Sequence, residues 1–304
     1  MMNVAYVGDL RAFSGIMMSL LSLAKENPNE SLSVYLLSGH FADKKKHYAS
    51  LGEKERAFLE KMIRTYQVAS NVHFIDCSVL FERELGNSVN LKNLYTPYAF
   101  MSIDLREETS AEAVYGFCRE NNIQVEALIN NAGTGTYGPF ADSFVDDNEA
   151  IVQLDVVTLL DLTYLFLHDM KERGQGYILN VASTAAFQPG PNLAVYYASK
   201  AFVESFTEAI AEENRGTGLR ISTFCPGPVD TPFLKKAGMD TSKVVEVFKP
   251  QDPVKLAEIA YKALMKGTVV IVPGAKNRRR LFATRLFSRA RIRKMMAKIT
   301  APKK

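Results

Sequence analysis

Tryptophan is absent from the 304-residue sequence, and cysteine and histidine are scarce, with three and four residues. The cysteines, Cys77, Cys118 and Cys225, stand far apart and form no C-x-x-C pair, which argues against a disulfide scaffold and a zinc knuckle. The histidines show no H-x-x-x-H spacing, so we expect no metal site. The apolar stretch at residues 15–24 is too short to span a bilayer and lacks the basic leader of a secretion signal. We therefore expect a cytoplasmic protein.

Acidic residues are missing from the last part of the chain. Residues 276–304 contain 12 Lys and Arg and no Asp or Glu, whereas residues 1–275 contain 25 basic and 33 acidic residues. Four apolar side chains are interleaved with these arginines: Leu281, Phe282, Leu286 and Phe287. The pattern predicts an amphipathic basic helix, which suits peripheral contact with an anionic membrane surface or an acidic partner such as an acyl carrier protein. A solvated tail and a helix packed on a cleft remain alternatives, and no reading motif favours nucleic acid.

Segments rich in β-branched and apolar residues alternate with segments of helical periodicity, and 47% of all residues are apolar. The expected strands are residues 4–7, 32–37, 98–103, 125–129, 177–181, 219–224 and 269–272. The expected helices are residues 14–26, 110–121, 146–172, 194–214 and 253–266. This alternation predicts an α/β protein with a doubly wound (Rossmann-type), mostly parallel seven-stranded sheet and helices on both faces. Such sheets bind ligands at the carboxyl ends of their strands.

The interval between the second and third expected strands, about residues 41–97, is too long for an unstructured loop in a compact domain. We interpret it as an insertion with a helix at about 53–66 and a strand at 72–76. The domain organisation is then a single Rossmann-type domain over residues 1–275 with this insertion, followed by the basic tail at 276–304.

Three short motifs follow successive strands or open a helix. Asn130-Asn-Ala-Gly133 comes directly after one expected strand, Ser183 follows the next one, and Tyr196-x-x-x-Lys200 opens the helix after it. Because positions i and i+4 share a helix face, Lys200 can lie beside the Tyr196 hydroxyl and pull the pKa of this phenol toward neutrality. Such a phenol can give a proton to a carbonyl or remove one from an alcohol, while Ser183 holds the reacting oxygen. The hydride must come from a cofactor, and a nicotinamide is natural in a doubly wound sheet.

The stretch from about residue 125 to 274 resembles the short-chain dehydrogenase/reductases, in particular ketoacyl-reductase-like members. The resemblance rests on Asn130-Asn-Ala-Gly133, Asn180-Val-Ala-Ser-Thr-Ala-Ala, Tyr196-Tyr-Ala-Ser-Lys200 and Pro226-Gly-Pro-Val-Asp-Thr231. It implies that Ser183, Tyr196 and Lys200 are catalytic, and that the apolar loop at 233–247 closes over the substrate. The cofactor contacts it implies are Lys200 at the nicotinamide ribose, Asn131, Ala132 and Gly133 in the cleft, Pro226, Gly227, Val229 and Thr231 at the nicotinamide end, and Asp104 near the adenine.

The first departure from the family's pattern concerns the loop that meets the pyrophosphate. Gly8 and Gly15 are separated by six residues, where the family's Thr-Gly-x-x-x-Gly-x-Gly loop has three, and Met17 replaces the third glycine. A longer loop can still wrap the pyrophosphate, so Gly8 and Gly15 are expected cofactor contacts. A weakened or lost cofactor site is the alternative, because Met17 adds bulk where the helix should lie close.

The second departure is Asp155, at the position where the family has an asparagine that positions a proton-relay water. We count it among the catalytic residues and expect its charge near Lys200 to keep Tyr196 protonated and slow the chemistry. The second strand ends in Ser38-Gly39-His40, which has neither the acidic residue typical of NAD sites nor an adjacent arginine. Lys44-Lys45-Lys46 follows and favours NADP, with NAD as the alternative.

These residues together predict an NAD(P)-dependent oxidoreductase that interconverts a ketone, such as a 3-oxoacyl or lipid-like one, with a secondary alcohol by hydride transfer. The alternative is a non-catalytic scaffold of the same family with impaired cofactor binding. The resemblance also implies a homo-oligomer paired through the helices expected at 146–172 and 194–214.

Overall fold

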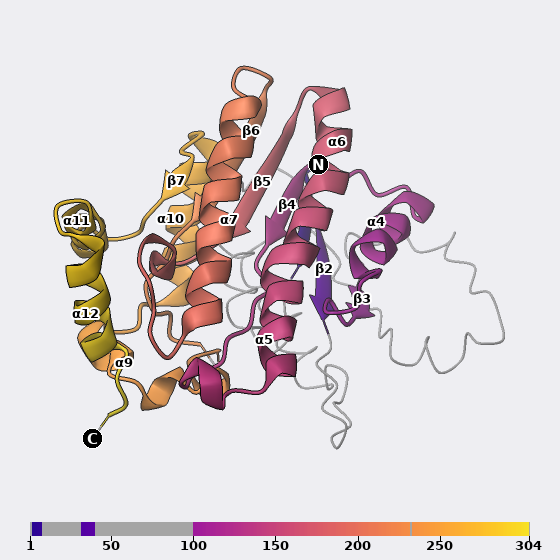
Figure 1. The fold of residues 1–304 in the computed structure, drawn as a ribbon. Helices are drawn as coiled ribbons and strands as arrows, with labels where there is room; N and C mark the ends of the chain where they lie inside the picture. Colours follow the sequence, from indigo (N-terminus) through magenta and orange to yellow (C-terminus); the bar gives the residue numbers. More distant parts are fainter. Residues whose placement is uncertain (1, 8–31, 40–99, 232, 304) are drawn as a thin grey trace.

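The computed structural model describes residues 2–7, 32–39, 100–231 and 233–303, and the side chains from residue 103 onward. Within this part of the chain a seven-stranded sheet has the order β3-β2-β1-β4-β5-β6-β7 (Figure 1). The strands are β1 (Met2–Val7), β2 (Leu32–Gly39), β3 (Phe100–Ile103), β4 (Ala127–Asn130), β5 (Gly176–Val181), β6 (Leu219–Phe224) and β7 (Val270–Ile271). All neighbouring pairs are parallel, which confirms the predicted doubly wound sheet. The direction of winding reverses between β1 and β4, the place where such sheets bind ligands.

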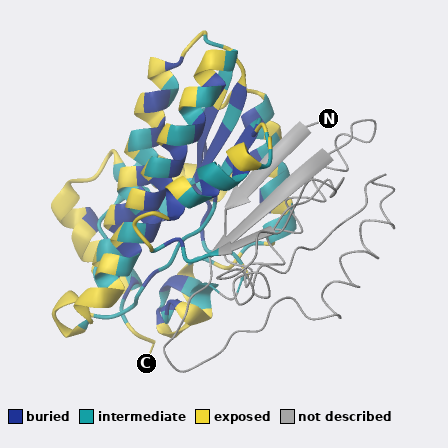
Figure 2. Ribbon diagram, turned by 90° about the vertical axis from the view of Figure 1, so that its right-hand side faces the viewer, coloured by how far each residue is buried: buried dark blue, intermediate teal, exposed yellow. Residues whose placement is uncertain are grey.

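One face of the sheet is covered by α4 (Ser110–Glu120), a long helical stretch and α7 (Ala194–Glu213) (Figure 1). The core on this side is built from apolar residues of the strands and of the helix faces that meet them. Val114 and Cys118 of α4, Phe166 of the long stretch, and Leu128 and Ile178 of the strands are each at most 3% exposed. Figure 2 shows buried residues on the inward helix faces and exposed ones outside, as the period of these helices predicts.

The opposite face is covered by α10 (Pro253–Met265) in the described part of the chain. Its Leu256, Ala260 and Leu264 pack on Leu179 of β5 and Phe224 of β6. Asp252 caps the helix by accepting a hydrogen bond from the Val254 N–H at 2.8 Å, with proline at the first helical position. The helix expected at 14–26 and the insertion at 41–97 lie outside the described residues.

The helix expected at 146–172 is present but not uniform. It consists of α5 (Val145–Val152), a π-helical turn (Gln153–Thr158) and α6 (Leu159–Arg173). By length and composition this 29-residue stretch could cross a membrane, with mean hydropathy 1.7 over its most apolar window. Leu154, Leu162 and Phe166 are nevertheless buried against the sheet, which is the arrangement of a core helix.

The basic tail forms two helices and not the single one predicted: α11 (Ala275–Thr284) and α12 (Arg289–Ile299) (Figure 1). The chain turns at 285–288 because Ser288 caps the second helix, accepting a hydrogen bond from the Arg291 N–H at 3.4 Å. Ile292 and Met296 of α12 are buried against Leu193 and Tyr197 at the start of α7. Of the alternatives for the tail, a helix packed on a cleft therefore describes α12.

Candidate active site

The predicted site residues meet at the carboxyl ends of three adjacent strands. Residues 131–133 follow β4, Ser183 stands two residues after β5, and residues 226–231 follow β6. Helix α7 begins beside them and carries Tyr196 and Lys200 in its first two turns. One cavity of about 710 Å³ has among its lining Asn131, Ala132, Gly133, Ser183, Tyr196, Lys200, Pro226, Gly227, Val229 and Thr231.

Ser183 is fixed by backbone contacts on two sides. Its Oγ accepts a hydrogen bond from the Ala185 N–H at 3.1 Å, which caps the 3-10 helix Thr184–Phe187. The same hydroxyl donates to the Pro226 carbonyl at 3.4 Å and also hydrogen-bonds Tyr196. The Ser183 side chain therefore both caps the 3-10 helix and lines the cavity.

The Lys200 ammonium faces a buried carboxylate. Its Nζ lies 3.1 Å from Asp155 Oδ2 and donates to the Val181 carbonyl at 3.2 Å. Asp155 is 0% exposed and Lys200 5% exposed. The carboxylate also accepts hydrogen bonds from the Thr134 N–H at 2.9 Å and from the Ser199 hydroxyl at 3.2 Å. Three donors thus compensate the desolvation of the buried Asp155 carboxylate.

The pKa of Tyr196 lies above its ordinary value of 10. Burial is the main cause; the hydrogen bond from Ser183 lowers the pKa, and the charge of Asp155 raises it. The Lys200 ammonium is 5.8 Å from the Tyr196 ring centroid and is directed to Asp155, so the expected pull of this pKa toward neutrality is not met here. The expectation that Asp155 favours the protonated phenol agrees with the structure.

The π-helical turn brings Asp155 to this position. It lies between α5 and α6, and such wider turns are frequent at functional sites. Sequence reasoning singled out Asp155 by its place in the family pattern but missed the turn, and it missed Thr134 and Ser199 as its partners. Periodicity gives no signal for a single extra residue in a helix.

A second buried polar group ties the strand ends to the helices. Asn130 Nδ2 donates to Asn180 Oδ1 at 2.9 Å and to Thr163 Oγ1 at 3.0 Å, and Asn180 Nδ2 donates to Thr207 Oγ1 at 3.0 Å. These bonds connect β4 and β5 with α6 and α7. They hold the loop that starts at Asn131 in register with α7, which carries Tyr196.

The cavity fits the nicotinamide and ribose end of a dinucleotide. At Gly133 an added Cβ would lie 3.1 Å from Lys200 Nζ and 3.3 Å from Asp155 Oδ1, so the backbone approaches both groups closely and a larger side chain would push them aside. At Gly227 a Cβ would lie 3.3 Å from Asn277 Nδ2. An ammonium beside backbone-lined walls suits ribose hydroxyls and a carboxamide. Gly8 and Gly15, the expected pyrophosphate contacts, lie outside the described residues.

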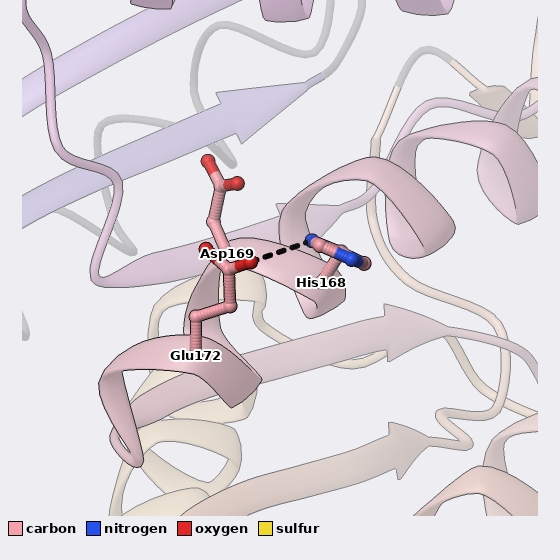
Figure 3. Close-up of side chains that lie close together, drawn as sticks. All are labelled: His168, Asp169 and Glu172. Atoms are coloured by element: carbon pink, nitrogen blue, oxygen red, sulfur yellow. Dashed lines mark ion pairs between the residues drawn. The ribbon is translucent and has the colours of Figure 1, made fainter.

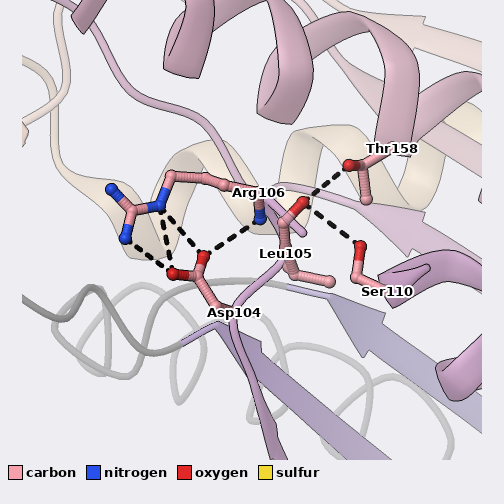
Figure 4. Close-up of polar contacts among 5 residues, drawn as sticks. All are labelled: Asp104, Leu105, Arg106, Ser110 and Thr158. Carbon is pink, nitrogen blue, oxygen red and sulfur yellow. Dashed lines mark hydrogen bonds and ion pairs between the residues drawn. The ribbon is translucent and has the colours of Figure 1, made fainter. Parts of the chain in front are cut away.

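Asp104, expected near the adenine, is held by its own loop (Figure 4). Its carboxylate accepts hydrogen bonds from Arg106 Nε at 3.0 Å and Nη2 at 2.6 Å. The Leu105 carbonyl accepts from Thr158 Oγ1 at 2.6 Å and Ser110 Oγ at 3.3 Å, which ties this loop to the π-helical turn. Asp104 is not among the described residues that line the cavity, so its adenine contact stays a prediction.

The outer wall of the cavity is mostly apolar, with Lys236, Asn277, Arg280 and Thr284 as its polar members. The segment implied to close over a substrate forms α8 (Phe233–Lys236), a 3-10 turn (Met239–Thr241) and α9 (Val244–Val247). The basic tail supplies the rest of this wall, a role that the sequence indicated only as one alternative for the tail. Apolar side chains from both segments line the cavity: Phe233, Leu234, Met239, Val247, Leu281, Phe287, Ile292, Met295, Met296 and Ile299.

Ligand-type side chains gather elsewhere on α6, at His168, Asp169 and Glu172 (Figure 3). His168 Nδ1 lies 3.7 Å from Glu172 Oε1, and both side chains are mostly exposed. Asp169 accepts a hydrogen bond from the Tyr115 hydroxyl at 2.9 Å. These contacts explain the group without a metal, and the expectation of no metal site stays a prediction.

A doubly wound parallel sheet, with Ser183 after β5 and Tyr196 and Lys200 on α7 lining one cavity, defines the class of protein as a dinucleotide-type α/β fold. A comparison with protein families matches residues 73–242 to the family described as short chain dehydrogenase. The chain therefore belongs to the short-chain dehydrogenase family, as the motifs indicated.

The curated relatives are similar over about half of the chain. Ketoacyl reductase HetN from Nostoc sp. is 31% identical over 172 residues, which is 56% of this chain and 58% of the relative. Sulfoacetaldehyde reductase 2 from Chromohalobacter salexigens is 30% identical over 161 residues, or 52% of this chain and 64% of the relative. The matched region thus spans less than two thirds of either relative.

Solved structures share the fold over nearly the whole chain. A short-chain dehydrogenase from Sphingobium yanoikuyae in complex with NADPH aligns with a TM-score of 0.65 and 18% identity, covering 100% of this chain and 98% of the other. A 7beta-hydroxysteroid dehydrogenase aligns with a TM-score of 0.69 and 17% identity, covering 97% and 96%. At this identity the likeness establishes the fold alone.

Proposed function

We propose that the protein is an NAD(P)-dependent reductase that converts a ketone to a secondary alcohol. The observation that carries this proposal is the convergence of Ser183, Tyr196 and Lys200 on one cavity beside the buried Asp155. Family membership and reductases among the relatives support it. Because Ser183, Tyr196 and Lys200 are all present at the cavity, an enzyme is favoured over the non-catalytic scaffold.

Tyr196 is the proposed acid, and its raised pKa keeps the phenol protonated at neutral pH. Ser183 orients the carbonyl oxygen toward this phenol and stabilises the charge that develops there. Lys200 would hold the nicotinamide ribose, with residues 131–133 and 226–231 around the nicotinamide ring. A bound reduced nicotinamide supplies the hydride in such a site.

NADP is the proposed nucleotide, with NAD as the alternative. The fold neighbour from Sphingobium yanoikuyae is described as an NADPH complex, and Lys44-Lys45-Lys46 follows the second strand of this chain. The mostly apolar outer wall supports a substrate with an apolar body, such as a 3-oxoacyl or other lipid-like ketone. The basic tail would meet an acidic carrier or an anionic membrane.

The proposed acid role is tested with Tyr196→Phe, which removes only the hydroxyl oxygen. We expect a loss of turnover of at least a hundredfold with NADPH binding retained. Tyr115→Phe removes a hydroxyl that bonds Asp169 on the far side of α6 and serves as the matched control. Unimpaired turnover of Tyr196→Phe would contradict the role. Absence of saturable binding of both NADPH and NADH in calorimetry would support the scaffold.

A homo-oligomer is proposed through the outer face of α5, α6 and α7. Five large apolar side chains are exposed there by 37% or more: Val152, Val157, Leu160, Tyr164 and Phe202. A patch of this kind on one face is typical of an interface. Sedimentation velocity of the wild type and of Leu160→Asp measures it, with a single monomeric species for both counting against the proposal. A cytoplasmic location, peripheral to a membrane, stays part of the proposal.

A further inference from the structure

The two tail helices meet at a corner with an unusual surface. The corner comprises Phe282 in the last turn of α11 and residues 285–288, and its large apolar side chains are exposed. Phe282 is 62% exposed, Leu286 69% and Phe287 45%. Single exposed apolar residues are common on proteins, but here three occur within six positions of the chain, and we call these three side chains the apolar tip.

The charged side chains that flank this apolar tip in sequence are all basic, whereas an acidic side chain from another element, Glu204 of α7, interacts with Arg285 of the corner. Arg279, Arg285, Arg289 and Arg293 are exposed, and residues 276–304 contain no acidic residue. An apolar tip flanked in sequence by exposed arginines has the composition of helices that lie in the interface of an anionic bilayer. An acidic protein would account for the charge alone, and it leaves the exposure of Phe282 and Leu286 unexplained.

The tail is fixed to the body of the protein, so the corner has a defined position. Ile292 and Met296 are buried, and the Thr300 carbonyl at the end of α12 accepts hydrogen bonds from the Tyr137 hydroxyl at 2.8 Å and from Asn192 Nδ2 at 3.1 Å. A helix held in this way can present its outer side to a membrane without unfolding from the cleft.

The corner also lies at the rim of the cavity that contains Tyr196. Phe287 and Met295 line this cavity and are each 45% exposed, so the cavity wall continues into the apolar tip. Further inside, Ile292 and Met296 pack with Met239, Phe233 and Tyr196 in one apolar cluster. Apolar side chains therefore extend from the tip to the proposed proton donor.

We propose that the α11–α12 corner docks on anionic lipid bilayers and admits an apolar ketone from the lipid into the cavity. The ketone delivery rests on the proposed reductase function, whereas the docking does not. Phe282 and Leu286 insert among the acyl chains, and the arginines contact lipid phosphates. The cavity rim at Phe287 then opens toward the bilayer.

Vesicle sedimentation tests the docking with all 304 residues present. Vesicles of phosphatidylcholine with 30% phosphatidylglycerol are compared with pure phosphatidylcholine, at low and high salt. We expect binding to the anionic vesicles only, weakened by salt. Phe282→Ser with Leu286→Ser, and separately Arg279→Glu with Arg293→Glu, should each lower the bound fraction at least tenfold.

The chain offers a matched control for exposed apolar residues. Phe140 and Phe144 are 65% and 78% exposed, but their neighbours in sequence are Asp142, Asp146 and Asp147. Phe140→Ser with Phe144→Ser should leave vesicle binding unchanged, because acidic surroundings oppose contact with an anionic bilayer. Equal loss in the control and the corner variant would overturn the proposal, as would no binding to anionic vesicles. Binding to a small acidic carrier protein without vesicle binding would assign the corner to a protein partner and also overturn it.

Ketone delivery has a separate readout. Phe282 and Leu286 do not line the cavity, so their double variant should reduce a short, water-soluble ketone at the wild-type rate. With a long-chain ketone dissolved in anionic vesicles its kcat/KM should fall at least fivefold. Equal kcat/KM values on the vesicle substrate would refute delivery. Lack of any turnover by the wild type on the soluble ketone would instead refute the proposed reductase function. The docking would then still be decided by vesicle sedimentation.

Discussion

The substitution Asp155→Asn isolates the effect of one buried charge on the proposed proton donor. Lys200 Nζ lies 3.1 Å from Asp155 Oδ2 and 5.8 Å from the Tyr196 ring centroid. A unit charge 5.8 Å away is worth about 3 kcal/mol at an effective dielectric constant of 20, or about 2 pKa units. The carboxylate cancels much of this attraction in the wild type. Removing it should lower the pKa of Tyr196 by about 1 to 2 units.

Alcohol oxidation is the assay, because this direction needs the deprotonated phenol as a base. The pH at which kcat/KM reaches half its plateau should fall by about 1 unit or more in Asp155→Asn. Ketone reduction, which uses the protonated phenol, should begin to decline at a correspondingly lower pH. Asp161→Asn, the same exchange on a neighbouring turn of this helical stretch, should leave the profile unchanged.

One result would refute this reasoning. The variant leaves the buried Lys200 without its counterion, and the reasoning fails if the attraction of its ammonium for the phenolate does not survive this change. The oxidation profile would then stay in place or move to higher pH. The free energy of unfolding of Asp155→Asn gives a second measurement. It should fall by about 3 to 5 kcal/mol if Lys200 keeps its charge, because a buried ion is then left unpaired.

Three further perturbations test the neighbouring structure. Gly133→Ala places a Cβ 3.1 Å from Lys200 Nζ and should raise the calorimetric Kd for the nucleotide at least tenfold, with the midpoint of urea unfolding little changed. Met296→Ala empties a buried position on α12 and should lower the free energy of unfolding by about 2 to 5 kcal/mol and raise KM for an apolar ketone. Burial and Glu208 raise the pKa of Glu204 from 4.5 to about 8, against the charge of Arg285. A folded-state pKa above the unfolded value stabilises the protein at low pH, and this contribution is lost as pH rises from about 4.5 to 8. Glu204→Gln should therefore reduce the fall in unfolding free energy between pH 5 and 8 by about 1 kcal/mol, discounted for solvent exposure; an unchanged fall counts against it.

The C-terminal helices show where local patterns fail. Leu281, Phe282, Leu286 and Phe287 interleaved with arginines predicted one amphipathic helix. The Ser288 cap divides it, and which apolar residues turn inward depends on the surface available at the start of α7. Ile292 and Met296 face that surface, whereas Phe282 and Leu286 do not. No periodicity within the tail contains this information.

The proposed proton-transfer site was likewise predictable only in part. Motif spacing placed Ser183, Tyr196 and Lys200 together, because strand ends and the first turns of a helix occupy fixed positions in a parallel sheet. It did not place the Lys200 ammonium on Asp155, which depends on the π-helical turn and on the Thr134 N–H.

The sequence by itself determined the alternation of strands and helices, and through it the parallel sheet, since a period of two or of 3.6 residues is a property of adjacent positions. It also determined which side chains reach the carboxyl ends of the strands. Only the tertiary structure decided where the charge of Lys200 is directed and that the tail closes the cavity. Both depend on groups distant in the chain, whose distances and desolvation exist only once the chain is folded.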